Sequence, residues 1–364
     1  MKEKTHFQDK RSPFSDNPFM MGYESNIFEA DEELGFRFPE GKIISGKGFV
    51  DLSEKLRGLK QKKIIIHNMG DSSTSGWNSE KVTKKNKNAF APFFTYKTYS
   101  DLIEEQSDLF VINAGVPGYS SLQGKLYLQR LLAFFEQKKI QAEYVTAYFG
   151  NNDGTYNKYG DSVRVVSKKI NLKSSVRVSI QEFKKNISDM IDLSQKHGAK
   201  IILFMPLVRY DWPPGLRSQK RRREFKKSFK KLTNSFVKIK LIRAISFFKK
   251  KMYEKALEED KVLPRLKKRY VLSLKQIADE KNILLIDVQN EITLHKSKQY
   301  FADYCHPIEK ANQLLVDRFF SLLHIQKKKK EIIPLQFRLF KAISCIPFPK
   351  RKEEEISANN YTLY

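Results

Sequence analysis

The stretch KIIIHNMGDSSTSG, residues 63–76, decides the fold of this chain. Its three successive isoleucines predict a short buried strand at 63–69, and the apolar run stops at Gly70-Asp71-Ser72. In an α/β protein, a buried strand that ends in a tight turn exposes the following side chains at the edge of the sheet where ligands bind. Ser72 is therefore a candidate reactive group, although Gly-Asp-Ser also suits an ordinary turn before a helix.

Similar strand and helix patterns alternate along the rest of the chain. Buried strands are predicted at 108–114, 143–149, 200–206 and 283–288, and helices at 99–106, 122–137, 180–197, 276–280 and from 307 onward. This alternation indicates an α/β fold in three layers, with a parallel sheet covered by helices on both faces. The predicted organisation is a lead-in segment at 1–62, a main domain at 63–325 with an insertion at 209–270, and a tail at 326–364.

Composition limits the classes of partner and location. Among 364 residues, 68 Lys and Arg stand against 41 Asp and Glu, a net charge of +27, which favours polyanionic partners. The two cysteines, Cys305 and Cys345, are too few for a disulfide framework and lack metal-ligand spacing. No metal or organic cofactor is expected. The polar opening MKEKTHFQDKRS predicts no secretory signal, and no apolar run reaches the roughly 18–20 residues of a membrane span. We therefore expect a cytoplasmic protein.

Polar residues follow the predicted strands at the edge where their carboxyl ends meet. Ser72, Gly118 and Asn152 follow the first three strands, and Asp303 and His306 follow the last. Asp303 and His306 are three residues apart, so Asp303 can hold the Nδ1 proton of His306 while Nε2 faces Ser72. This arrangement is the relay that activates a serine hydroxyl. The amide of Asn152 and the backbone N–H groups of Ser72 and Gly118 would then form an oxyanion hole.

Each of these residues also has a structural interpretation. Asn152 suits an Asx turn, and His306 suits a loop before Pro307. Cys305 offers a thiol as an alternative nucleophile, although it also fits a buried packing position. The catalytic hypothesis depends on the joint occurrence of the motifs at successive strand ends.

Four blocks resemble the SGNH hydrolases, also called GDSL-type esterases and lipases. They are Gly70-Asp71-Ser72-Ser73-Thr74-Ser75-Gly76, Asn113-Ala114-Gly115-Val116-Pro117-Gly118, Gly150-Asn151-Asn152-Asp153 and Asp303-Tyr304-Cys305-His306-Pro307. The resemblance implies a five-stranded parallel sheet of flavodoxin-like order between helices. It also implies Ser72 as nucleophile, His306 as base, Asp303 as its orienting partner, and Gly118 and Asn152 as oxyanion donors. Ala311 departs from the glycine that is common in the family's last helix, a difference that concerns packing.

The insertion at 209–270 carries a basic amphipathic pattern. A long helix opening near residue 220 is predicted to place one apolar stripe beside many lysines; the stripe contains Phe225, Phe229, Leu232, Phe236, Ile239 and Ile242. Such a helix suits an anionic membrane surface, and the alternative is that the stripe packs on the domain. Residues 220–251 and the similar tail segment 327–352 are thus candidate membrane contacts. No nucleic acid partner is expected, because no base-stacking platform is recognisable.

These observations predict a serine ester hydrolase that works through an acyl-enzyme on a small-molecule or glycan acyl ester. The preferred substrate class is a carbohydrate O-acetyl ester or another short-chain acyl ester. One alternative is a lysophospholipase or thioesterase at the membrane surface. Another is a non-catalytic protein that uses the same fold to bind glycan or membrane.

Overall fold

The computed structural model describes residues 28–45, 48–59, 64–77, 96–157, 161, 176–217 and 222–325. The chain divides into two compact units, Met1–Lys327 and Lys328–Tyr364. The second unit and the whole predicted tail at 326–364 lie outside the described residues.

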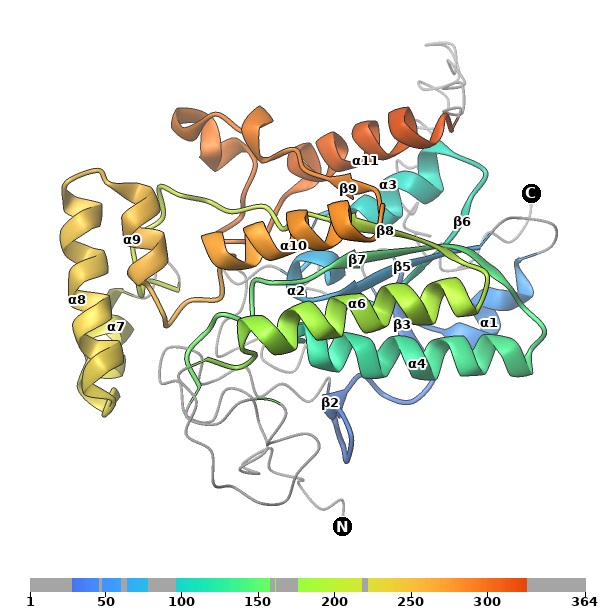
Figure 1. Ribbon diagram of the computed structural model, residues 1–364, viewed down its shortest axis with the longest axis horizontal. Helices are drawn as coiled ribbons and strands as arrows, with labels where there is room; N and C mark the ends of the chain where they lie inside the picture. Colours follow the sequence, from blue (N-terminus) through green and yellow to red (C-terminus); the bar gives the residue numbers. More distant parts are fainter. Residues whose placement is uncertain are drawn as a thin grey trace, which may run out of the picture. The chain divides into compact units, whose positions relative to one another are not determined.

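A seven-stranded sheet lies at the centre of the first unit (Figure 1). In spatial order its strands are β4 (Gly48–Asp51), β3 (Lys42–Ser45), β6 (Phe110–Asn113), β5 (Ile64–Gly70), β7 (Ala142–Tyr148), β8 (Lys200–Phe204) and β9 (Leu285–Ile286). The strands from β6 to β9 run parallel, in flavodoxin-like order. They coincide with the five predicted strands to within a few residues.

The prediction of a five-stranded sheet is not confirmed, because two antiparallel strands extend the sheet. β3 pairs with β6 and with β4, and both belong to the segment predicted as a separate lead-in. A second hairpin from the same segment, β1 (Glu29–Asp31) with β2 (Gly35–Arg37), forms a small sheet of its own. The helix α1 (Leu52–Arg57) follows β4. The proposed boundary at residue 62 therefore separates strands that belong to one sheet.

Helices cover both faces of the sheet. Figure 1 shows α4 (Ser121–Gln137), α6 (Ile180–Lys196) and α10 (Lys268–Glu280) on one face, with α3 (Tyr99–Gln106) and α11 (Glu309–Leu323) on the other. Successive residues of β8 point to opposite faces, as in any strand. Ile201 and Leu203 join one apolar cluster, while Ile202 and Phe204 join the other. The predicted three layers are thus present, with a core on each side of the sheet.

Local signals in the sequence set the starts of two of these helices. The Thr98 hydroxyl accepts the backbone N–H of Asp101 at the start of α3, and the Asp101 carboxylate accepts the backbone N–H of Thr98. Ser179 and Glu182 form the same reciprocal pair at α6. This capping box satisfies two backbone donors that a helix start otherwise leaves without partners. Two short 3-10 helices, η5 (Gln289–Glu291) and η6 (Leu294–Gln299), connect β9 to α11.

The insertion forms three helices in place of the long one that was predicted. They are α7 (Arg222–Lys231), α8 (Ser235–Lys249) and α9 (Tyr253–Glu259). The chain leaves helical conformation at residues 232–234, and Asn234 caps α8 by accepting the backbone N–H of Val237 at 3.0 Å. Because of this break, the prediction of a single apolar stripe is wrong. Phe225, Phe229 and Leu232 join a buried cluster, whereas Phe236, Ile239 and Ile242 are exposed. Lys220 and Arg221 lie outside the described residues.

Among the helices in the described part of the chain, none has the length and apolar composition needed to cross a membrane.

Candidate active site

Ser72 begins a one-turn helix, α2 (Ser72–Ser75), directly after the central strand β5. The carboxylate of Asp71 caps this turn by accepting the backbone N–H of Ser73 at 2.8 Å. A Cβ built on Gly70 would lie 2.1 Å from the Thr74 hydroxyl oxygen, so only glycine lets the helix fold back this closely onto the strand. The half-buried Ser72 is therefore held by a sharp strand-to-helix turn, as predicted for the end of this strand.

Ser72, His306 and Asp303 form a continuous chain of hydrogen bonds. The Ser72 Oγ lies 2.7 Å from His306 Nε2, and His306 Nδ1 lies 2.7 and 2.8 Å from the two Asp303 carboxylate oxygens. A carboxylate only accepts hydrogen bonds, so Nδ1 carries the imidazole proton and Nε2 accepts the proton of the serine hydroxyl. The backbone N–H groups of Cys305 and His306 donate to Asp303 Oδ1 at 3.1 Å and fix the carboxylate. The geometry is that of a nucleophile, its base and the group that orients the base.

Cys305 Sγ lies 3.9 Å from both ring nitrogens of His306, a longer contact than the 2.7 Å of Ser72 Oγ. Its side chain is buried, and burial raises the pKa of the thiol well above its usual value. Because the thiolate is the reactive form, the thiol is a poor nucleophile here. Cys305, Asp303 and His306 also have their potential metal-ligand atoms within 4.8 Å of one another. The Asp303 oxygens and His306 Nδ1 are already bonded to each other, and a protonated thiol is a poor ligand, so this donor set fits the relay better than a metal.

Asn152 joins the turn of Ser72 to the loop of Gly118. Its side-chain N–H groups donate to Asp71 Oδ2 at 3.2 Å and to the Tyr119 carbonyl at 3.0 Å. One amide thus contacts the residue before Ser72 and the residue after Gly118. Both amide hydrogens are used within the protein, so Asn152 must exchange one of these bonds to donate to a substrate oxyanion.

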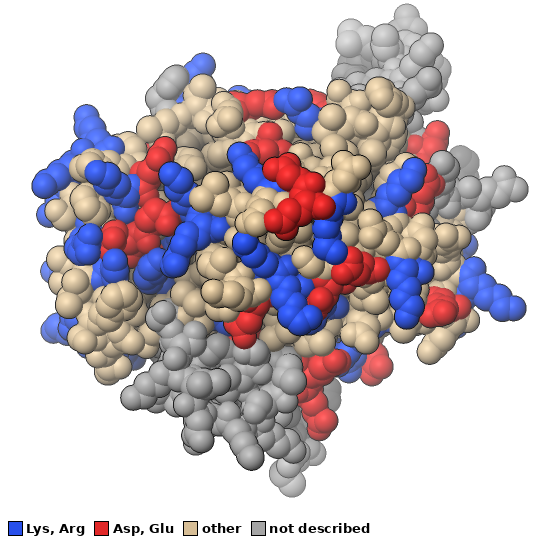
Figure 2. Space-filling view, in the orientation of Figure 1, with Lys and Arg blue, Asp and Glu red and all other residues tan. Residues whose placement is uncertain are grey.

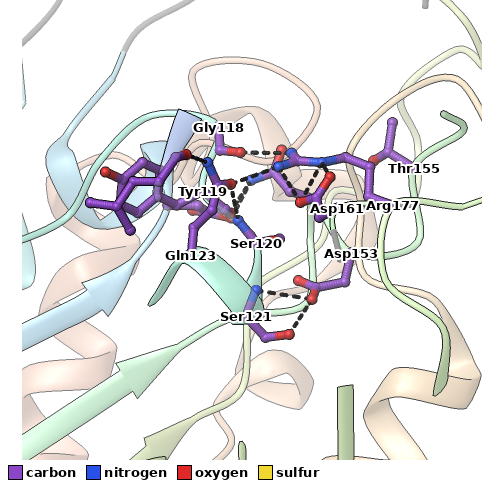
Figure 3. Close-up of polar contacts among 12 residues, drawn as sticks. Gly118, Tyr119, Ser120, Ser121, Gln123, Asp153, Thr155, Asp161 and Arg177 are labelled. Atoms are coloured by element: carbon purple, nitrogen blue, oxygen red, sulfur yellow. Dashed lines mark hydrogen bonds and ion pairs between the residues drawn. The ribbon is translucent and has the colours of Figure 1, made fainter. Parts of the chain in front are cut away.

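The loop of Gly118 is held by a buried arginine that the sequence did not indicate (Figure 3). Gly118 has φ +86°, a left-handed conformation that favours glycine. Arg177 Nη1 donates to the Gly118 carbonyl at 2.6 Å, and Nη2 donates to Gln123 Oε1 at 2.8 Å. The guanidinium also binds the Asp161 carboxylate, through Nε at 3.1 Å from both oxygens and through Nη2 at 2.7 Å from Oδ2. Both partners of this ion pair are about 1% exposed, so the pair is shielded from solvent.

Two buried carboxyl groups lie beside these residues. Burial raises the pKa of Asp153 to about 6, although hydrogen bonds from the Ser121 hydroxyl and backbone N–H favour the charged form. Burial likewise raises the pKa of Asp71, although the backbone hydrogen bond from Ser73 and the nearby His306 act to lower it. The site therefore contains acids whose charged forms are disfavoured by low solvent access.

The structure brings together the predicted residues of the site. Ser72, His306 and Asp303 contact one another in sequence, and Asn152 and Gly118 connect to them through Asp71 and Tyr119. Sequence reasoning missed the roles of Asp71, Tyr119, Gln123, Asp161 and Arg177. Of these, Asp71 and Tyr119 had a local signal, as neighbours of Ser72 and Gly118; Gln123, Asp161 and Arg177 belong to none of the motifs.

The sequence model of the GDSL-like lipase/acylhydrolase family matches residues 69–255, just over half of the chain. The chain belongs to this family. The resemblance to SGNH, or GDSL-type, hydrolases is thus confirmed, and the protein is a hydrolase that acts on ester bonds. The match includes Ser72, Gly118 and Asn152, whereas Asp303 and His306 lie beyond its end.

Similar solved structures come from several bacteria. A lipase/acylhydrolase from Enterococcus faecalis is 17% identical over 73% of this chain and 99% of its own, with a TM-score of 0.40. A GDSL-like lipase from Bacteroides thetaiotaomicron is 14% identical over 75% of this chain and 95% of its own, also at 0.40. A catalytic mutant of an acetylxylan esterase from Geobacillus stearothermophilus is 14% identical over 73% and 95%, at 0.37. No curated protein sequence matches the chain.

Proposed function

We propose that the hydrolase cleaves esters through an acyl-enzyme on Ser72. The observation that carries this proposal is the 2.7 Å contact of the Ser72 hydroxyl with His306 Nε2, continued to Asp303. Ser72 Oγ attacks the acyl carbonyl carbon while its proton passes to His306 Nε2, and Asp303 stabilises the imidazolium that forms. His306 then returns the proton to the departing alkoxide. In the second half of the reaction, water gives its proton to His306 and attacks the acyl carbonyl. The acid leaves as the proton returns to Ser72 Oγ.

The oxyanion of each tetrahedral intermediate would be stabilised by Asn152 and by backbone N–H groups of Ser72 and Gly118. Ser72 is the first residue of α2, so its N–H is among those that a helix leaves without an intrahelical partner. Asn152 would give up its longer bond, the one to Asp71, and turn that N–H to the substrate. These three donors come from the ends of three parallel strands, where an open α/β sheet binds its ligand.

We place the substrate among short-chain acyl esters, with an O-acetylated carbohydrate as the preferred class. Ser72 and Asn152 contact His306, Asp71 and the Tyr119 carbonyl, so hydrogen-bonding groups lie beside the proposed position of the reacting carbonyl. A sugar hydroxyl next to an acetyl ester can use such groups, whereas a long acyl chain cannot. A second candidate is a lysophospholipase or thioesterase at a membrane surface. The exposed Phe236, Ile239 and Ile242 favour it.

Labelling with a fluorophosphonate probe tests the nucleophile. The wild type and Ser73→Ala should be labelled, whereas Ser72→Ala should not. Ser73 is the matched control because it is adjacent, and its hydroxyl donates to the Cys305 carbonyl and does not face His306. Labelling that persists in Ser72→Ala, or that disappears in Cys305→Ala, contradicts the assignment.

A panel of p-nitrophenyl esters of graded chain length, together with acetylated sugars, tests the substrate class. For the short-chain proposal kcat/KM should be highest with acetyl and fall as the chain lengthens. A rise in kcat/KM with chain length would favour the lysophospholipase or thioesterase alternative.

A further inference from the structure

Helix α8 has two apolar faces, of which only one is buried. Val237, Leu241 and Ala244 are fully buried. On another side of the helix Phe236, Ile239 and Ile242 are 53%, 57% and 53% exposed. Residues three apart are neighbours on a helix surface, so these three side chains form one row. We call it the α8 apolar row. It contains half of the large apolar side chains that are exposed among the described residues.

The fold does not explain the α8 apolar row. α8 is already anchored through its buried face, which shares a cluster with Trp212, Tyr304 and Cys305. Ion pairs from Lys240 and Arg243 to Glu259 also join α8 to α9. Single exposed apolar residues are common on protein surfaces, but a contiguous row is typical of an interaction surface.

The charges on α7 and α8 are almost all positive. Residues 222–251 contain twelve Lys or Arg and one acidic residue, Glu224. The lysines of α7 are exposed, as are the last lysine of α8 and the two lysines that follow it: Lys226, Lys227, Lys230, Lys231, Lys249, Lys250 and Lys251. Figure 2 shows Lys and Arg side chains gathered at the left, where Figure 1 places α7, α8 and α9, with acidic side chains among them. The acids of α9 are Glu254, Glu258 and Glu259. The apolar row therefore lies on a strongly cationic pair of helices.

We propose that α7 and α8 dock the protein on an anionic lipid bilayer. α8 would lie in the plane of the interface with Phe236, Ile239 and Ile242 among the acyl chains, while the lysines contact lipid phosphates. A short apolar row beside a basic face is the pattern of helices that bind at the membrane surface. The buried cluster that α8 shares with Tyr304 and Cys305 would place the interface near the block that contains His306.

Two other kinds of partner fit these features less well. A second copy of the chain would bring two cationic faces together, and like charges repel. Three side chains also make a small contact compared with the roughly 800 Å² per partner of a stable interface. Nucleic acid would use the lysines, but isoleucine side chains have no partner on a phosphate backbone. Only the lipid surface uses both the apolar row and its charge.

Vesicle co-sedimentation with the full chain tests the apolar row. The test variant is Phe236→Ser/Ile239→Ser/Ile242→Ser, and the matched control changes three exposed leucines on other helices to Ser: Leu272, Leu294 and Leu322. With vesicles of mixed phosphatidylcholine and phosphatidylglycerol, the test variant should bind at least about tenfold more weakly than wild type, and the control within about twofold. The comparison isolates α8 from the lysine-rich tail, because both variants keep that tail.

A second pair of variants tests the charge. Lys226, Lys227, Lys230 and Lys231 change to Gln in the test variant, and exposed lysines elsewhere change to Gln in the control: Lys138, Lys196, Lys296 and Lys298. The test variant should lose at least about tenfold in affinity, because each cation near an anionic surface contributes to binding. Raising the salt from about 0.1 M to about 1 M should weaken binding of the wild type, since it shortens the screening length.

Melting curves check that each variant is folded, and the changed side chains are exposed, so their cost in stability should be small. Three results would overturn the proposal: no binding of wild type to anionic vesicles at low salt, equal binding to vesicles of phosphatidylcholine alone, or equal binding by the test and control variants. The first two need no variant. A dimer lost in the apolar-row variant, without vesicle binding by wild type, would reassign the row to a protein interface.

Discussion

The two halves of the candidate site differ in how far they are assembled. In the half that activates the nucleophile, Ser72, His306 and Asp303 already make hydrogen bonds of 2.7–2.8 Å. In the half that would hold the oxyanion, the Asn152 amide gives both of its hydrogens to the protein itself. The first half is ready before substrate arrives, whereas the second must exchange a bond.

This difference follows from where the residues come from. Asp303 and His306 lie three residues apart, and backbone N–H groups of the same loop fix the carboxylate. Asn152 and Gly118 come from two different loops, which are held by partners that are distant in sequence. Variants in the first half should therefore remove proton transfer as a whole. Variants in the second half should remove one contribution among several.

The largest effect is expected for Asp303→Asn. An asparagine amide facing His306 Nδ1 stabilises the tautomer with its proton on Nε2, which cannot accept the Ser72 proton. We expect kcat for a soluble ester to fall by about 10³–10⁴-fold. Steady-state kinetics measure the loss, and a melting curve shows whether the variant is folded. A kcat within tenfold of wild type would mean that Asp303 does not orient the base.

Asn152→Ala should have a smaller effect. Loss of one oxyanion donor should lower kcat by about 10²–10³-fold with little change in KM. Asn151→Ala is the comparison variant, because the side-chain amide oxygen of Asn151 accepts the backbone N–H of Leu266 and holds a loop, while its side chain also lies beside Asp71. We expect Asn151→Ala to lower the melting temperature and to reduce kcat less than Asn152→Ala does. An Asn152→Ala enzyme that loses affinity but keeps kcat would make Asn152 a binding residue.

Arg177→Lys tests whether the second half depends on its buried support. Lysine keeps the charge but cannot bind Asp161, Gly118 and Gln123 together, so the free energy of unfolding should fall by about 1–3 kcal/mol. Displacement of the Gly118 loop should also lower kcat by about tenfold.

Arg265→Lys serves as the control for Arg177→Lys, because Arg265 forms an equally buried ion pair with Asp260 at the same 2.7 Å distance. Its other contacts are to the carbonyls of Arg209 and Trp212. It should lose similar stability with at most a few-fold change in kcat. Equal losses of kcat in the two variants would show that Arg177 acts only through stability.

A last effect concerns stability alone, as a pH dependence from Asp153. Burial raises its pKa from 3.8 to about 6, so the folded protein holds this proton more tightly than the unfolded chain. The stability that protonated Asp153 contributes to the fold is therefore complete below about pH 4 and is lost as the pH rises to about 6. Asp153→Asn keeps a neutral side chain, so from pH 4 to pH 7 it should gain about 3 kcal/mol in free energy of unfolding relative to wild type. Denaturant titrations measure the difference, and parallel pH curves would contradict the shift.

The sequence by itself determined the parallel part of the sheet and most of the site. Apolar runs located β5, β6, β7, β8 and β9, and the polar residues after them located Ser72, Asn152 and His306. This works because a buried parallel strand must be apolar throughout, and its carboxyl end must be where the polarity changes. The spacing of Asp303 and His306 was equally local, so their contact was predictable without knowledge of the rest of the fold.

Other features had sequence signals that were too weak to decide. The strands β3 and β4 each have four residues, and their apolar pairs flank a Ser-Gly-Lys-Gly stretch that suits a hairpin. In the insertion, Asn234 is a good helix cap, yet the three- and four-residue spacing of apolar side chains continues across it. Two helices and one long helix therefore produce nearly the same pattern.

Only the tertiary structure decided what each apolar face and each buried charge would meet. Leu232 and Phe236 have the same spacing signal, but Leu232 packs beside Trp212 and Tyr304 while Phe236 is exposed. Arg177 carries no motif, and its position beneath Gly118 depends on Asp161, which lies 16 residues away, and on Gln123, 54 residues away. Periodicity records which side of an element is apolar. What lies opposite that side is set by segments far away in the chain, because packing and ion pairing join residues by distance in space and not by order in sequence.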